Sequence, residues 1–121
     1  MTRPRVLIAD DQQPILDWLD QQLRDEFEIV AACTDGSTAL ESAIALQPDA
    51  LVLDISMPQM SGLDVARRLS ALPNPPRIVF LSVHEDRDFQ EAATAAGGSG
   101  YVIKRNLCTH LVAALRRALS N

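Results

Sequence analysis

Five short apolar segments rich in branched side chains recur at nearly even spacing along the chain. They cover residues 5–9, 28–32, 50–53, 77–81 and 101–104. The gaps each leave room for a helix, and the first contains Ile15, Leu19 and Leu23 at helical spacing. The five segments are mostly apolar throughout, which is typical of parallel strands covered on both faces. We therefore predict a three-layer α/β sandwich with right-handed crossovers.

The length and charge of the chain narrow its function. We expect residues 1–121 to form one domain, because 121 residues leave no room for a second core. A net charge of −5 argues against non-specific binding of this segment to nucleic acid or anionic membranes. No apolar run approaches the roughly 20 residues that span a bilayer, and MTRPRVLIADD has no signal-peptide stretch. We expect a cytoplasmic protein without a membrane partner.

The chain contains two cysteines, Cys33 and Cys108, which have no metal-ligand spacing. Disulfides are rare in a reducing compartment. We therefore expect both cysteines to be small buried apolar residues that do not form a disulfide.

Carboxylates stand at the ends of two predicted strands. Asp10 and Asp11 follow the first strand, and Asp54 follows the third in LVLDISMPQMSG. In a flavodoxin-like strand order of 2-1-3-4-5 these two strands are neighbours, and ligands bind at the carboxyl ends of such strands. Two unit charges ~4 Å apart repel by ~4 kcal/mol at an effective dielectric near 20. The crowding of three carboxylates predicts a hard divalent cation, and Mg²⁺ prefers carboxylates together with phosphate oxygens.

Two further strand ends supply a hydroxyl group and an ammonium group. Ser82 ends RIVFLS, and Lys104 ends YVIK. Taken alone, such a serine is usually a turn residue, such a lysine is usually solvated, and Asp11 equally suits a turn. Beside three acids, however, the metal and the lysine would offset charge on phosphoryl oxygens, and the serine would donate a hydrogen bond. The four strand ends together predict a phosphoryl-binding site.

Four segments match the pattern of one family in the right order. They are VLIADDQQPIL (6–16), PDALVLDISMPQMSGLDV (48–65), IVFLSVHED (78–86) and AAGGSGYVIKRN (95–106). Together they resemble the receiver domain of response regulators, the phosphoacceptor module of two-component signalling. LSVHED and AGGSGYVIK most resemble the NarL/FixJ-like class, whose members usually carry a DNA-binding domain after the receiver. The resemblance covers essentially the whole chain and implies a CheY-like fold of five strands and five helices.

The resemblance implies an acceptor and its metal ligands. Asp54 would be the phosphoacceptor. Asp10 and Asp11 would hold Mg²⁺ directly or through water, together with Asp54 and the backbone carbonyl of Ser56. Gly62 would shape the loop after the acceptor.

The resemblance also implies residues that respond to the phosphoryl group. Ser82 would contact it and Lys104 would pair with it. Tyr101 matches the aromatic switch residue that turns inward on activation, although without the family it equally suits a strand residue packed on the fifth helix. Ser56 and His84 occupy positions that tune dephosphorylation, and we expect His84 to be exposed at the rim of the site.

The function that follows is that of a signalling module rather than a turnover enzyme. A sensor histidine kinase would donate the phosphoryl group, and the surface of the fourth helix, fifth strand and fifth helix would change. Transcription would be controlled through a C-terminal effector domain outside this chain, which would be the only contact with DNA, and a homodimer remains open. The alternatives are a stand-alone receiver and a phosphorylation-independent protein-binding module. A haloacid-dehalogenase-like phosphatase fits less well, because it needs D-x-D where Ile55 and Ser56 follow Asp54.

Overall fold

The computed structural model describes residues 2–120, which contain one five-stranded parallel sheet. Its order is β2-β1-β3-β4-β5, which confirms the predicted flavodoxin-like arrangement 2-1-3-4-5. The strands are β1 (Arg5–Ala9), β2 (Glu28–Cys33), β3 (Ala50–Asp54), β4 (Arg77–Ser82) and β5 (Gly100–Ile103). Asp54 and Ser82 are therefore the last residues of their strands, whereas Lys104 follows β5 instead of ending it.

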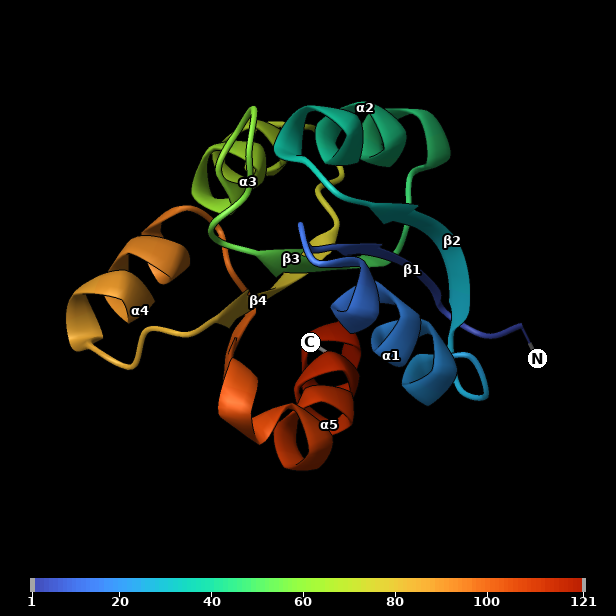
Figure 1. Ribbon diagram of the computed structural model, residues 1–121. Coiled ribbons are helices and arrows are strands. Elements are labelled where there is room, and N and C mark those ends of the chain that lie inside the picture. Colours follow the sequence, from blue (N-terminus) through green and yellow to red (C-terminus); the bar gives the residue numbers. More distant parts are fainter. Residues whose placement is uncertain (1, 121) are drawn as a thin grey trace.

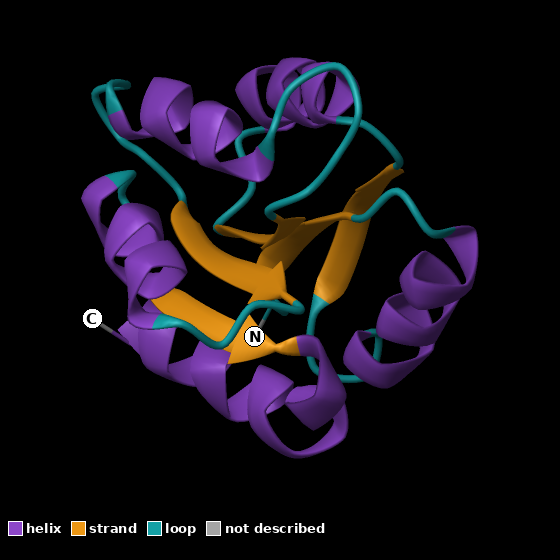
Figure 2. Cartoon of the chain, turned by 60° about the vertical axis from the view of Figure 1, so that its left-hand side comes forward, coloured by secondary structure: helices purple, strands orange, loops and turns teal. Residues whose placement is uncertain are grey.

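Helices cover both faces of the sheet, as predicted for a three-layer sandwich (Figures 1 and 2). α1 and α5 lie on one face, and α2, α3 and α4 pack on the other. The helices are α1 (Gln13–Leu23), α2 (Gly36–Leu46), α3 (Gly62–Ser70), α4 (Arg87–Ala95) and α5 (Leu107–Ser120), with a 3₁₀ turn, η1 (Lys104–Asn106), before α5. Within residues 2–120 no helix is both long and apolar enough to cross a membrane.

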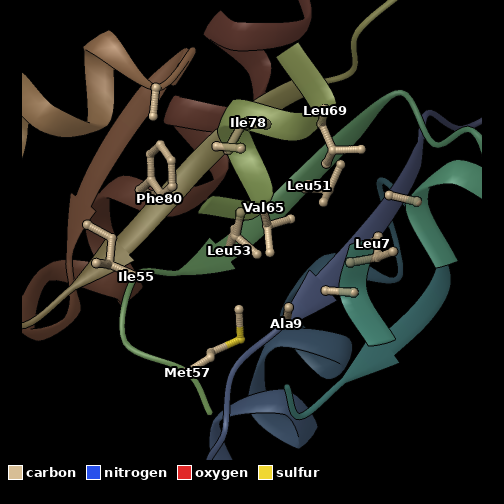
Figure 3. Close-up of a cluster of buried hydrophobic side chains, with 14 of the residues drawn as sticks. Leu7, Ala9, Leu51, Leu53, Ile55, Met57, Val65, Leu69, Ile78 and Phe80 are labelled. Carbon is tan, nitrogen blue, oxygen red and sulfur yellow. The ribbon is translucent and has the colours of Figure 1, made fainter. Parts of the chain in front are cut away.

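The strands divide the hydrophobic core into two halves. Val6 and Ile8 of β1 face the cluster formed with α1 and α5, whereas Leu7 and Ala9 face the cluster formed with α2, α3 and α4. Figure 3 shows the second cluster. Side chains alternate between the faces of a strand, so a sheet covered on both faces needs apolar residues at every position. This arrangement explains the uninterrupted apolar segments of the sequence.

One of the two cysteine predictions is wrong. Cys33 is buried at the end of β2, and burial raises the pKa of its thiol. Cys108 is exposed, because the face of α5 that meets the sheet contains Leu107, Leu111 and Leu115, and Cys108 lies about 100° away from Leu107 around the helix. Both cysteines are free thiols, as expected.

Candidate functional site

Three carboxylates meet at the carboxyl ends of β1 and β3. One oxygen from each of Asp10, Asp11 and Asp54 lies within 4.8 Å of the others. β1 and β3 are hydrogen-bonded neighbours in register, with Ala9 opposite Leu53, so the residues that follow in each strand emerge side by side. Asp10 has an exposed fraction of 0% and Asp54 of 4%, whereas Asp11 is exposed. The structure thus brings together the acids that the sequence analysis selected.

Lys104 is the cation that faces this cluster. Its Nζ atom lies 2.8 Å from Oδ2 of Asp10 and 3.4 Å from Oδ2 of Asp54, and its side chain is 16% exposed. Burial alone would lower the pKa of Lys104. The contact with Asp10 and the negative charges of Asp54 and Asp10 outweigh burial and raise that pKa, so the lysine is an ammonium.

The cluster also suits a divalent cation. Its donors are carboxylate oxygens, which hard cations such as Mg²⁺ prefer. Oδ2 of Asp10 is fully buried, and among the described residues no hydrogen-bond donor is well aligned with it, so its contact with Lys104 is an ion pair of poor hydrogen-bond geometry. Such an oxygen can accept a further positive partner, and the acidic pocket is therefore compatible with divalent metal binding.

The surroundings of Asp54 disfavour its charged form. Burial is the largest influence and raises the pKa of Asp54, and the charge of Asp10 raises it further. Lys104 and the backbone N–H of Ser56, which donates to Oδ1 of Asp54 at 3.3 Å, act in the opposite direction. The net result is a pKa of about 6, against an ordinary value of 3.8. A bound cation would stabilise the carboxylate and lower this pKa.

This raised pKa predicts how stability depends on pH. Between pH 4 and pH 6 the folded state holds more protons on Asp54 than the unfolded state does, so its contribution to the free energy of unfolding falls as pH rises. At pH 7 without metal, Asp54→Asn should increase the free energy of unfolding by up to about 3 kcal/mol. Urea unfolding at pH 4.5 and pH 7 measures the effect, which should be largest at pH 7. Equal stability of the two proteins at pH 7 would contradict it.

Ser82, His84 and Tyr101 form a second group next to the cluster. Ser82 is 2% exposed at the end of β4, and its hydroxyl oxygen accepts a hydrogen bond from the backbone N–H of His84 at 2.9 Å. The Tyr101 hydroxyl on β5 donates to the carbonyl of His84 at 2.8 Å. The loop after β4 is therefore tied to both the end of β4 and the side chain of β5.

The expectation that His84 is exposed is wrong. Its ring stacks on Phe89 of α4, with ring centroids 3.9 Å apart and an interplanar angle of 1°, and the residue is half-buried. The sequence analysis missed Phe89 as a neighbour, although the spacing of five residues across the start of a helix permits the contact. The stack links the loop after β4 to the first turns of α4.

The remaining rim residues are Ser56 and Arg105. Ser56 is exposed in the loop after β3. Arg105, next to Lys104, forms an exposed ion pair with Glu85 in the loop after β4. None of the peptide bonds in residues 2–120 is cis, so the Lys104–Arg105 bond is trans. Nothing in the sequence pattern pairs Arg105 with Glu85, which lies 20 residues earlier.

Comparison with known proteins identifies this arrangement. The family model for the response regulator receiver domain matches residues 6–116. The chain belongs to the response-regulator receiver family. Receivers are signalling modules of two-component systems rather than classical enzymes. The predicted acids and Lys104 fall inside the matched part of this receiver.

The receiver is similar to transcriptional regulators. It is 38% identical to the transcriptional regulatory protein PrrA of Mycobacterium tuberculosis over 119 residues, which cover 98% of this chain and 51% of PrrA. It is 37% identical to PdtaR of the same organism over 117 residues, or 96% of this chain and 57% of PdtaR. The chain thus spans about half the length of these relatives.

Solved structures agree with this family. The receiver domain of the putative response regulator NarL from Mycobacterium tuberculosis matches with a TM-score of 0.93 at 27% identity, covering 100% of this chain and 99% of that one. The chemotaxis protein CheY4 of Vibrio cholerae matches with a TM-score of 0.86 at 26% identity, covering 98% and 100%. The CheY-like fold expected from the sequence is confirmed.

Proposed function

We propose that residues 1–121 act as one receiver domain in which Asp54 accepts a phosphoryl group from the phosphohistidine of a sensor histidine kinase. The observation that carries this proposal is the convergence of Asp10, Asp11 and Lys104 on Asp54. A lone strand-end aspartate has no such partners. Transfer from a cytoplasmic kinase domain is consistent with the two free thiols of the chain.

The proposed reaction is a displacement at phosphorus. A carboxylate oxygen of Asp54 attacks, an O–P bond forms, and the P–N bond to the donor imidazole breaks with its electron pair returning to nitrogen. Lys104, already 3.4 Å from Asp54, offsets negative charge on the transferred oxygens. Mg²⁺ held by Asp10, Asp11, Asp54 and the Ser56 carbonyl would supply further positive charge at the same oxygens.

The proposed output begins with the new charge at Asp54. Phosphorylation adds up to about one extra unit of negative charge, by analogy with other phosphorylated side chains. The Ser82 hydroxyl would turn to donate to the phosphoryl group and leave its bond with the N–H of His84. Tyr101 would then move inward, and the surface of α4, β5 and α5 would change. Ser56 and His84 would set the rate of dephosphorylation.

The proposed role of the whole protein is transcriptional control. Relatives that are twice as long are transcriptional regulators, which favours a C-terminal effector domain that contacts DNA. A stand-alone receiver is the second candidate, and a change of oligomeric state on phosphorylation would fit either.

Labelling with acetyl phosphate tests the proposal. With Mg²⁺ present, the wild-type chain should take up no more than one phosphoryl group, in a form released by hydroxylamine. It should not turn over a generic phosphate ester such as p-nitrophenyl phosphate, whereas a phosphatase would. A folded chain that takes up no label would favour the phosphorylation-independent binding module instead.

Asp11→Ala should weaken Mg²⁺ binding by about tenfold or more, because it removes the exposed carboxylate of the three. Trp18 fluorescence is a suitable probe, because this half-buried residue of α1 lies close in the chain to Asp11. Asp17→Ala is the matched control, since Asp17 is exposed on α1 and bonded to Gln13. Unchanged Mg²⁺ affinity in Asp11→Ala would count against the acidic cluster as a metal site.

A further inference from the structure

The first residue of α2 touches the loop that follows Asp54. This acceptor loop, residues 55–61, connects β3 to α3. The backbone N–H of Gly36 donates to the carbonyl of Pro58 at 3.2 Å. A Cβ atom on Gly36 would lie 1.8 Å from the carbonyl oxygen and 2.6 Å from the carbonyl carbon of Met60. Both are backbone atoms, so any side chain at position 36 would have to displace the loop.

The contact with Gly36 is at the half of the acceptor loop that lacks deeply buried side chains. The first half is anchored by Ile55 and Met57, whose side chains are buried in the core cluster beneath α2 and α3 (Figure 3). Pro58 and Gln59 are exposed, and Gln59 has a positive φ of 71°. The backbone contacts with α2 therefore hold a turn that side-chain packing holds only weakly.

We propose that Gly36 is a positioning residue for phosphorylation. The absence of a side chain lets the N-terminus of α2 press against the acceptor loop, which fixes the path of the backbone through Ser56 beside Asp54. This inference rests on the proposed function. It assigns to α2, whose residues are absent from the acidic cluster, a direct influence on Mg²⁺ affinity and on the rate of phosphorylation.

The contact reverses the effect expected from helix propensity. Alanine is more favourable than glycine in a helix, so Gly36→Ala would stabilise α2 if only the helix mattered. The approach to Met60 predicts the opposite, a lower melting temperature together with a displaced acceptor loop. Because a general loss of stability would also lower the melting temperature, the test needs a reading at the site itself.

Three glycine-to-alanine variants separate these effects. In Gly98→Ala the new Cβ would lie 2.7 Å from the Phe80 ring and 2.8 Å from the carbonyl of Ala93, which is a clash away from the acceptor loop. In Gly100→Ala the nearest atom would be 3.4 Å away, which is ordinary contact. Melting temperature, Mg²⁺ affinity and the rate of labelling by acetyl phosphate are measured for each. Gly36→Ala should lose about fivefold or more in Mg²⁺ affinity and labelling rate, whereas Gly98→Ala should lose only stability.

A second pair of variants decides the question if Gly36→Ala does not fold. Asp35 caps α2, because its carboxylate accepts hydrogen bonds from the backbone N–H of Thr38 at 2.8 Å and from the Thr38 hydroxyl at 3.0 Å. Asp35→Ala removes the cap and loosens the start of α2, whereas Asp35→Asn removes the same charge but keeps an acceptor. Asp35→Ala should weaken Mg²⁺ binding about two- to threefold, and Asp35→Asn should bind as the wild type does.

The outcomes distinguish this inference from the function on which it rests. A wild-type chain that neither binds Mg²⁺ nor takes up phosphate would overturn the proposed function and this inference with it. If the wild type is labelled but Gly36→Ala matches Gly98→Ala in Mg²⁺ affinity and labelling rate, only the role of Gly36 is overturned. Where Gly36→Ala is unfolded, equal Mg²⁺ affinity of Asp35→Ala and Asp35→Asn has the same consequence.

Discussion

Asp54→Asn should abolish labelling by acetyl phosphate, because an amide has no carboxylate oxygen with which to attack phosphorus. The expected loss is complete within detection, measured as hydroxylamine-sensitive label in the presence of Mg²⁺. Asp64→Asn is the matched control, since it removes an exposed carboxylate on α3 that pairs with Arg67. That control should take up label at the wild-type rate.

The stability of Asp54→Asn guards against a trivial explanation of the loss. An unfolded variant would also fail to take up label, but the raised pKa of Asp54 predicts that the variant unfolds at a higher urea concentration than the wild type at pH 7. Loss of label with gain of stability would assign the acceptor role to Asp54. Hydroxylamine-sensitive label on another carboxylate of Asp54→Asn, at the wild-type rate, would make the assignment wrong.

Lys104→Met should destabilise the metal-free protein by about 3–5 kcal/mol at pH 7, the range found when one partner of a buried ion pair is removed. Asp10 is fully buried, and the Lys104 ammonium lies 2.8 Å from its Oδ2 atom. Urea unfolding gives the change in free energy. Mg²⁺ should restore part of the loss, because a cation in the cluster again offsets the charges of Asp10 and Asp54.

Arg105→Met provides the comparison for this result. Arg105 lies next in the chain, and its ion pair with Glu85 is exposed, so its loss should cost less than about 1 kcal/mol. Below pH 6 the destabilisation of Lys104→Met should shrink, since the crowded carboxylates can then protonate. If Lys104→Met were as stable as Arg105→Met at pH 7, the lysine would not be the charge that keeps the buried acids folded.

The strand order and the acidic cluster were predictable because both follow from local patterns. Apolar runs without polar alternation indicate a sheet covered on both faces, and the polar residues that end such runs must gather at one edge of a parallel sheet. The strand boundaries were less well predicted. Asp54 and Ser82 belong to β3 and β4, because backbone pairing continues through a polar residue as readily as through an apolar one.

The contacts that sequence reasoning missed join residues through the fold rather than along one element. No pattern in the chain shows that Gly36 meets the backbone of Met60 or that Arg105 meets Glu85. For Cys108 a signal did exist, since the spacing of Leu107 and Leu111 already sets the buried face of α5 and leaves Cys108 outside it. Polarity alone suggested that it was buried, and periodicity decides otherwise.

The two-sided core has a consequence for how such a chain can diverge. An exchange of one branched apolar residue for another leaves both halves of the core filled. The insertion of a single residue into β3, whose five residues are all buried, would instead reverse the facing of every later position in the strand and carry Asp54 out of line with Asp10. Evolution can therefore rewrite the side chains of this sheet far more freely than it can lengthen or shorten the strands.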